Sequence, residues 1–151
     1  MIKRILDPEE FKIVVSDIFE LHAYDLEHWA HYYIRHNKES VIENFANKHL
    51  LYWKVFVWAN HNGDKWDAVI LFIEDHNPMF GAKMFSEHIW LSKNPKVGYK
   101  LLTTALKFAK EKEFEVVSMG AVEKHPNSDK VKEFYNKLGF KKDSETYVAK
   151  L

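Results

Sequence analysis

The sequence of 151 residues contains no cysteine. This absence excludes thiol nucleophiles, disulfide frameworks and zinc sites built on thiolates, and it fits the reducing environment of the cytoplasm. Repeats, linkers and low-complexity tracts are absent as well, so we expect a single domain over residues 1–151. With 46% hydrophobic residues, the chain can bury a core without covalent cross-links.

Long apolar runs are also missing. The longest, from Ala68 to Ile73, falls far short of the roughly 20 residues that a membrane span requires. The N-terminus is too charged for a signal peptide. We therefore expect a soluble cytoplasmic protein with no membrane partner.

Neither sign of charge is in excess, because 22 basic residues balance 22 acidic ones. A nucleic-acid-binding protein normally has a basic surplus, so the balance speaks against that class. Locally the charge is uneven. The stretch from Lys93 to Lys110 holds several lysines and no acid, which favours a phosphorylated small molecule as a ligand. Residues 17–27 are acidic instead, which favours a cationic acceptor.

The spacing of apolar residues predicts the elements in order. We expect a strand at 2–6, helices at 8–22, 24–35 and 39–48, hairpin strands at 52–59 and 67–74, a strand at 83–91, a helix at 98–112, a strand at 114–122, a helix at 130–138 and a strand region at 140–151. Strands followed by alternating strands and helices indicate an α/β protein, with a mixed sheet and helices on both faces.

The helix near the C-terminus has an unusual apolar stripe. Val131, Phe134, Tyr135 and Leu138 have helical spacing, and Gly139 follows where a left-handed cap is common. A tyrosine in this stripe must find a partner for its hydroxyl or border a cavity.

The run Phe-Tyr-x-x-x-Gly-Phe, from Phe134 to Phe140, resembles the closing motif of the GNAT superfamily of acetyl-coenzyme-A-dependent N-acetyltransferases. Upstream, Ser128 and Val131 stand where the family more often has Asn and Ala. The resemblance extends with decreasing strength over roughly residues 50–151. It implies a GNAT-like α/β fold, with a mixed, mostly antiparallel central sheet flanked by helices on both faces. It also implies an acyl-CoA N-acyltransferase with acetyl-coenzyme A (acetyl-CoA) as co-substrate.

An acid interrupts the strand at 83–91. Strict alternation places Glu87 on one face with Phe85, Ile89 and Leu91. Burying a carboxylate costs several kcal/mol unless it is paired or protonated, so one interpretation is a general base whose pKa is raised by desolvation. The other is a structural acid near a strand end or paired with a lysine. Family members often place a glutamate on this strand to deprotonate the acceptor, which favours Glu87; His88, on the opposite face, is the alternative base.

The next loop enters a helix, where free N–H groups and the helix dipole form an anion site. Gly98 removes a Cβ that would block close approach of a diphosphate. The family signature is Gln/Arg-x-x-Gly-x-Gly/Ala, and this chain has Lys93-x-x-Lys96-x-Gly98. Either the lysine side chains supply the charge, or the loop no longer binds the cofactor well. A lysine-rich helix face is also commonly just solvated.

The resemblance implies a wedge for acetyl-CoA between the strand that ends near Leu91 and the strand at 114–122. It assigns the catalytic roles to Glu87, which deprotonates the amine, and Tyr135, which protonates the departing thiolate. A phenol has an ordinary pKa above that of a thiol, so it can donate this proton. Core packing alone is the alternative for Tyr135. The residues implied to bind the cofactor are Ile89, Trp90, Leu91, Lys93, Lys96, Val97, Gly98, Tyr99 and Ser128.

Histidines gather in the second quarter of the chain, at positions 22, 28, 31 and 36. No His-Glu-x-x-His pattern is present, so we expect no metal. We expect the partner to be a small-molecule or protein amine and the protein to be a monomer or homodimer. The alternative is a catalytically silent GNAT-fold module with a binding or structural role, because the closing segment also resembles small GNAT-like proteins of bacteriophages.

Overall fold

A computed structural model describes the chain except residues 30–36, 50–53, 77–78, 80, 124 and 150. The described residues form two compact units, each of which is treated by itself. The first comprises Met1–His22 and Asn37–Gly120, and the second comprises Ala23–His36 and Ala121–Leu151. One functional domain over the whole chain stays a prediction.

The first unit is built on a five-stranded sheet in the order β1-β2-β3-β4-β5. Its strands are β1 (Ile2–Ile5), β2 (Val55–His61), β3 (Trp66–His76), β4 (Lys83–Ser92) and β5 (Val116–Ser118). Neighbours from β1 to β4 pair antiparallel, and β4 pairs with β5 in parallel. The sheet is therefore mixed and mostly antiparallel, which confirms the predicted fold class.

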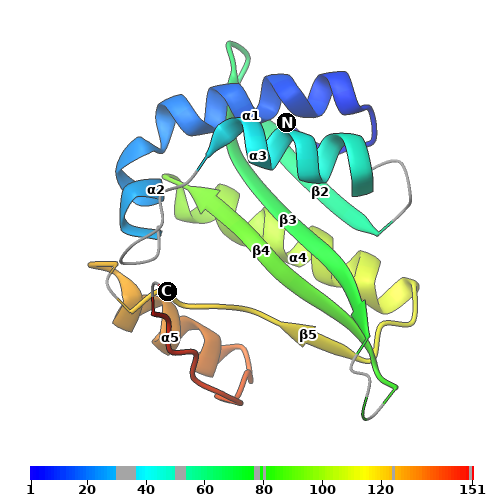
Figure 1. The fold of residues 1–151 in the computed structure, drawn as a ribbon, viewed down its shortest axis with the longest axis vertical. Coiled ribbons are helices and arrows are strands. Elements are labelled where there is room, and N and C mark those ends of the chain that lie inside the picture. The colour runs from blue at the N-terminus through cyan, green and yellow to red at the C-terminus, as the bar shows by residue number, and fades with distance from the viewer. Residues whose placement is uncertain (30–36, 50–53, 77–78, 80, 124, 150) are drawn as a thin grey trace. The chain divides into compact units, whose positions relative to one another are not determined.

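Helices cover both faces of this sheet (Figure 1). The first unit contains α1 (Pro8–Leu21), α3 (Lys38–Val41), the π-helix η1 (Ile42–His49) and α4 (Pro95–Glu111); the second contains α2 (Ala23–Trp29) and α5 (Ser128–Lys137). The start of α1 follows the predicted signal. The Asp7 side chain accepts a hydrogen bond from the Glu9 N–H, and Pro8 occupies the first helical position.

Each face of the sheet has its own apolar layer. On one face, Phe11 and Val14 of α1 border a small apolar void together with Leu71 of β3 and Ile89 of β4. On the other face, Phe108 of α4 packs against aromatic rings of β2 and β4. Its ring centroid lies 5.1 Å from Phe56, 5.2 Å from Trp58 and 6.3 Å from Phe85. Such aromatic contacts supply much of a core's stabilisation.

Arg4 of the edge strand β1 extends over this aromatic layer. Its guanidinium carbon lies 4.5 Å from the ring centroid of Phe108 and within 6 Å of the centroids of Phe56 and Trp58, at 5.6 and 5.8 Å. Burial lowers the pKa of Arg4 from its ordinary value, although the group stays a cation at neutral pH.

In the second unit, α5 ends as its sequence predicts. Gly139 has a φ of +86°, its N–H donates to the Asn136 carbonyl, and the Phe140 N–H donates to the Tyr135 carbonyl. These two bonds form a Schellman motif, which requires a left-handed residue and therefore favours glycine. The predicted helix stop at Gly139 is confirmed.

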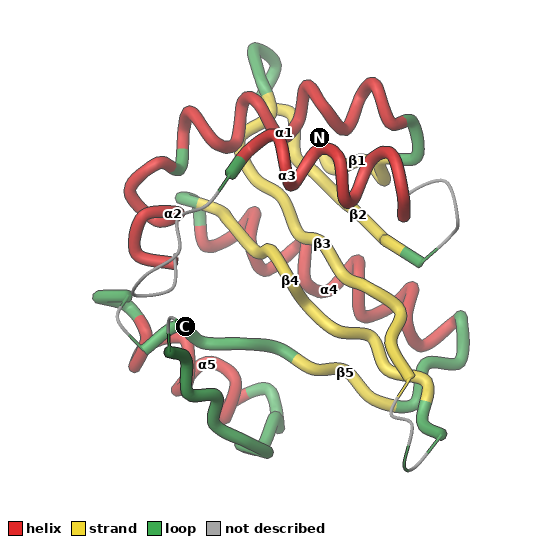
Figure 2. Tube along the Cα trace, viewed as in Figure 1, coloured by secondary structure: helices red, strands yellow, loops and turns green. Residues whose placement is uncertain are grey.

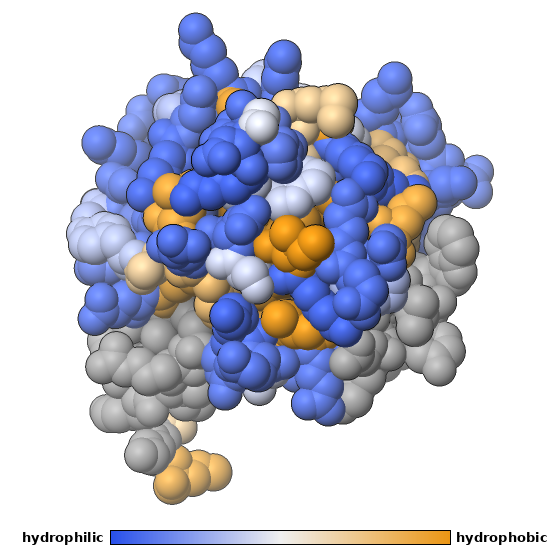
Figure 3. Space-filling view, turned by 90° about the horizontal axis from the view of Figure 1, so that it is seen from above, coloured by the Kyte–Doolittle hydropathy of each residue, from blue (hydrophilic) through white to orange (hydrophobic). Residues whose placement is uncertain are grey.

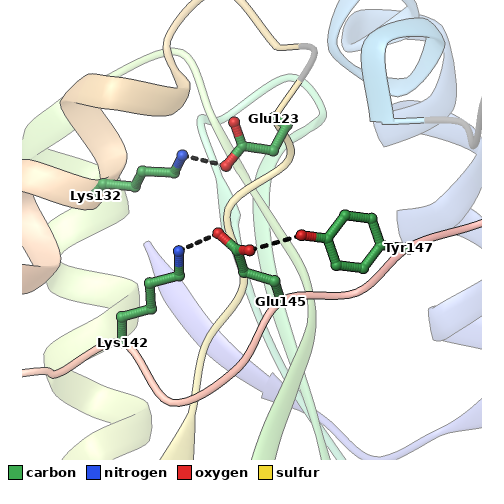
Figure 4. A network of polar contacts seen from close by, with 5 residues as sticks. All are labelled: Glu123, Lys132, Lys142, Glu145 and Tyr147. Carbon is green, nitrogen blue, oxygen red and sulfur yellow. Dashed lines mark hydrogen bonds and ion pairs between the residues drawn. The ribbon is translucent and has the colours of Figure 1, made fainter.

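Two predicted strands are wrong in extent. The strand expected at 114–122 pairs only over Val116–Ser118. The strand region expected at 140–151 forms no strand in its described part, residues 140–149 and 151. Its polar contacts are local and exposed: Glu145 pairs with Lys142 and accepts a hydrogen bond from the Tyr147 hydroxyl at 2.9 Å (Figure 4). Closely spaced charges break the apolar alternation that would bury one face of a strand.

The surface seen from above the view of Figure 1 is mostly hydrophilic, with apolar patches separated by polar side chains (Figure 3). Single exposed apolar residues of this kind are normal for a folded protein. Among the described residues, no helix has both the length and the apolar character needed to cross a bilayer.

Candidate active site

The candidate site begins where β4 changes its pairing. Met84 to Ser86 pair with β3 on one side and with Val116 to Ser118 of β5 on the other. From Glu87 to Ser92, the described chain pairs β4 only with β3. Figure 2 shows β4 as a long strand and β5 as a short strand beside only part of it. One edge of β4 therefore has backbone groups that no strand of the described chain takes up.

A β-bulge at His88 separates the two halves. Leu71 of β3 pairs with Ile89, but the next residue, Phe72, pairs with Glu87, so His88 is the extra residue on β4. Paired residues share a face. Ile89 therefore lies on the α1 side with Leu71, and Glu87 lies on the α4 side with Phe72.

The predicted grouping of Glu87 with Ile89 and Leu91 is therefore wrong. Of the three apolar residues in the predicted group, Phe85 alone shares the face of Glu87. The ring of Phe85 stacks on Phe72 at a centroid distance of 4.0 Å. The reason is the bulge, which inserts one residue and reverses the alternation beyond it.

Glu87 has the environment of a general base. Its side chain is half-buried, and burial raises the pKa of Glu87 from its ordinary value of 4.5 to about 7. The Gly120 N–H donates to its Oε2 at 3.1 Å and, by favouring the ionised form, limits this rise in pKa. No lysine, arginine or histidine of the described residues forms an ion pair with Glu87. A carboxyl with a pKa near neutrality is half ionised at pH 7 and can take up and release a proton.

His88, the alternative base, points to the other face. Its ring lies 6.3 Å from that of Phe45 in η1. Partial burial lowers the pKa of His88, and the negative charge of Asp75 raises it by a smaller amount. The two candidate bases therefore lie on opposite sides of the sheet, as predicted for this pair.

The helix that follows β4 starts earlier than predicted. α4 begins at Pro95, not at Gly98, because Asn94 caps it: the Asn94 side chain accepts from the Lys96 N–H at 3.0 Å. The Gly98 N–H donates to the Asn94 carbonyl at 2.9 Å, so both of these amides are already used within the helix start. The dipeptide Asn94-Pro95 is a helix-start signal that the sequence interpretation missed.

Gly98 has a packing role in the structure. It is buried, and a Cβ added there would lie 3.2 Å from the Ser92 Cβ and 3.6 Å from the Trp90 Nε1. The glycine therefore allows α4 to pack closely on β4, and its contact with a diphosphate stays a prediction.

The remaining predicted cofactor residues of the first unit surround this helix start. Lys93 and Lys96 are exposed, Tyr99 is 48% exposed, and Val97 is half-buried. The charges of the two lysines are therefore available to a soluble anion, whereas the amides of Lys96 and Gly98 are not.

In the second unit, Ser128 and Tyr135 are the buried residues of α5. Ser128 is 6% exposed, and its hydroxyl has no hydrogen-bond partner among the described residues. Tyr135 is 9% exposed, with its ring 5.6 Å from that of Phe140. A buried hydroxyl without a partner costs about 1–3 kcal/mol, so Ser128 fits a contact to a polar ligand group.

The acidic stretch near the N-terminus is partly used in structural contacts. The Asp17 carboxylate accepts from the Trp66 N–H at 3.0 Å. His125 uses both ring nitrogens, because its Nδ1 accepts from the Asn127 N–H and its Nε2 donates to Asp25 at 2.9 Å. These contacts weaken the argument for a cationic acceptor, and the sequence interpretation missed His125.

His22 and His28 make separate contacts. His22 is fully buried and donates from Nε2 to the Asp67 carbonyl, while His28 bonds the Tyr24 carbonyl through Nδ1. His31 and His36 lie outside the described residues. Within the described part of the chain, no group of three or more metal-ligating side chains converges.

Comparison with solved structures finds proteins with a similar fold. No protein-family model matches the sequence, and no curated protein matches it significantly. A predicted acetyltransferase from Clostridium acetobutylicum that holds acetyl-CoA superposes with a TM-score of 0.74 at 15% identity, over 99% of this chain and 95% of that one.

Two further solved structures are similar to this fold. A ribosomal-protein-alanine N-acetyltransferase from Brucella melitensis biovar Abortus 2308 gives a TM-score of 0.69 at 12% identity, over 100% of this chain and 98% of that one. An aminoglycoside acetyltransferase from an uncultured soil metagenomic sample, in complex with sisomicin, gives 0.69 at 16% identity, over 100% and 95%. The chain therefore has the fold of these acetyltransferase structures, as its closing motif predicted.

Proposed function

We propose that this protein is a cytoplasmic N-acetyltransferase that transfers the acetyl group of acetyl-CoA to a primary amine. The observation that carries the proposal is Glu87, a half-buried carboxylate with a pKa raised to about 7, located where β5 separates from β4. A structural surface acid needs no such environment, whereas a base that works at neutral pH does.

In the proposed reaction, Glu87 accepts a proton from the acceptor ammonium, directly or through a water molecule. The free amine then attacks the thioester carbonyl, the C–N bond forms, and the C–S bond of the tetrahedral intermediate breaks. Tyr135 donates its proton to the departing thiolate. No covalent enzyme intermediate is required, so the protein supplies positioning and proton transfer.

Three features of the chain support acetyl-CoA as the donor. At Ile89 and Leu91, β4 pairs with β3 and with no β5 residue of the described chain, so we infer that the backbone of these two residues bonds the amides of a pantetheine arm. The Ser128 hydroxyl lacks a partner, and Lys93 and Lys96 offer charge to phosphates. Because Asn94 already caps the Lys96 amide, we expect the phosphates to be bound mainly by lysine side chains.

A second candidate function is a silent GNAT-fold binding module. Lys96 replaces a glycine of the family signature, and its amide is used by the Asn94 cap. Calorimetric titration with acetyl-CoA separates the two candidates, because only the enzyme must bind it near its cellular concentration. Absence of binding would falsify the proposed enzymatic function and favour the silent binding module.

Thiol release with a panel of amines then tests the residue roles. The panel contains a peptide α-amine, a lysine side chain, a polyamine and an aminoglycoside. We expect Glu87→Gln to lower kcat by about 100-fold or more, and Tyr135→Phe by about 10-fold or more, since a thiolate leaves with less assistance. The matched controls are Glu115→Gln and Tyr147→Phe, which alter exposed residues of the same types. Equal turnover in the test and control variants would show that the roles are wrongly assigned.

A further inference from the structure

The Glu87 carboxylate has a backbone partner that the sequence did not indicate. The ladder between β4 and β5 ends with the pair Ser86 and Ser118. Immediately beyond it, the Gly120 N–H donates to the Glu87 Oε2 at 3.1 Å. The Glu87 side chain thus connects β4 to the segment after β5 at the first position beyond the backbone ladder.

No charged group among the described residues of the first unit offers Glu87 a comparable interaction. Its cross-strand neighbour on β3 is Phe72, and β5 brings Val117 and Ser118 beside the preceding residues of β4. His88, next along the strand, faces η1. β3 has four titratable residues. Glu74, Asp75 and His76 pair with Phe85, Met84 and Lys83, which precede Glu87 on β4. Asp67 lies near the start of β3 and accepts a hydrogen bond from the Asn60 side chain at 2.8 Å. The buried side of α4 presents Gly98, Leu101, Leu102, Ala105 and Ala109, none of which titrates.

We propose that the Gly120 N–H is the positioning group of the catalytic base, which holds one carboxylate oxygen of Glu87 on the β5 side and favours its ionised form. This inference rests on the proposed function for its catalytic meaning. An N–H bond to a carboxylate fixes the direction of the remaining lone pairs, so the second oxygen stays available to the acceptor proton. Without that bond, burial alone would keep Glu87 protonated to higher pH and remove the base at neutral pH.

The role belongs to the amide and not to the absence of a side chain. The backbone of Gly120 does not have the left-handed φ found at Gly63, Gly81 and Gly139. A Cβ added at Gly120 would lie 3.8 Å from the Glu87 Oε2, which is an ordinary contact. Alanine can therefore replace this glycine while keeping the donor, and proline removes the donor.

The first test needs no substrate. The chain has only 5 glycines, so the amide signal of Gly120 can be assigned in a nitrogen–proton NMR spectrum. We expect this signal to titrate with the same midpoint as the Glu87 carboxyl carbon, and to lose that titration in Glu87→Gln. A Gly120 signal that stays constant while Glu87 titrates would overturn the inference.

The second test compares Gly120→Pro with Gly120→Ala. A hydrogen bond to a charged group is worth about 1.5–3 kcal/mol, so its loss should raise the titration midpoint of Glu87 by about 1–2 pH units in the proline variant. The alanine variant should keep the wild-type midpoint within about 0.3 units. Equal midpoints in the two variants would contradict the role of the amide.

The pH profile of kcat/KM links this result to catalysis. Its lower limb should shift upward with the NMR midpoint in Gly120→Pro. If the NMR midpoint shifts while no amine is acetylated by the wild-type protein, the contact is correct and the proposed function fails. If the wild-type protein acetylates amines and the limb of Gly120→Pro stays in place, the positioning role fails and the function stands.

Discussion

The two halves of β4 differ in how they are paired. Lys83 to Ser86 lie between β3 and β5, with both backbone edges in use. Glu87 to Ser92 still pair with β3 but no longer pair with β5. The pairing with β5 ends next to the bulge at His88. The first half contributes the fully buried Phe85 to the aromatic layer, and the second half begins with a carboxylate of raised pKa.

The difference lies in the backbone groups that each half can offer to a ligand. A doubly paired strand offers its ligands only side chains, whereas a strand with one free edge also offers N–H and C=O groups. The extra residue matters because it sets the faces on which Glu87 and Ile89 lie. Three sets of variants test this contrast, in decreasing order of effect.

Insertion of one alanine between Leu71 and Phe72, opposite His88, should have the largest effect. The inserted residue gives His88 a partner and removes the bulge, so Glu87 and Ile89 must share a face, and either the carboxylate enters the apolar α1 layer or Ile89 leaves it. The expected loss is on the order of 4 kcal/mol in the free energy of unfolding, with loss of turnover. The control is His88→Ala, which keeps the residue count and should cost about 1 kcal/mol. Similar urea midpoints for the two variants would contradict the importance of register.

Glu87→Gln should change how stability depends on pH. The pKa of Glu87 in the folded protein, about 7, lies above the ordinary 4.5, so the folded state binds the proton more tightly. This contribution is fully present below about pH 4.5 and is lost as the pH rises through 7. The variant cannot lose it, so at pH 8 it should be more stable than the wild type by up to roughly 3 kcal/mol, with little difference at pH 4.5.

Unfolding by urea at several pH values measures this difference. Glu74→Gln, which alters an acid opposite the doubly paired half, is the control and should keep the wild-type slope. A Glu87→Gln variant that parallels the wild type at all pH values would rule out a buried, proton-binding carboxyl.

The smallest expected effect is on acetyl-CoA binding by the lysines that follow β4. Lys93→Ala and Lys96→Ala should each weaken acetyl-CoA binding by about two- to fivefold, because an exposed charge contributes about 0.5–1 kcal/mol. Salt should reduce the difference. Lys107→Ala and Lys110→Ala, on exposed positions further along α4, are the matched controls. If all four variants bind equally, the lysines near Asn94 do not contact the phosphates.

Local signals predicted much of the fold. The cap at Asp7-Pro8, the hairpin of β2 and β3, and the Schellman motif at Gly139 each depend on residues that are adjacent in sequence. The α4 start at Asn94-Pro95 carried the same kind of signal and was missed because the glycine at 98 was given more weight.

The site was predictable only in part. Glu87 could be singled out because an acid among apolar neighbours is costly. The bulge could not be predicted, since nothing in the sequence around His88 distinguishes an extra residue from regular alternation, and the register is set by β3. Gly120 could not be found either, because its role depends on a contact with a residue far earlier in the chain. Tyr135 is buried as expected, and its catalytic role stays a prediction, as does the cofactor contact of Ser128.

The guanidinium of Arg4 has a consequence for the opposite edge of the sheet. β1 is the outer strand there and spans only Ile2–Ile5. A short edge strand with a cation held among aromatic rings is a poor template for another chain, because a strand added beside it would have to desolvate that charge. We expect Arg4→Leu to leave the monomer folded but to increase self-association in concentrated solutions, which light scattering would measure. Arg4 would then limit aggregation through this edge.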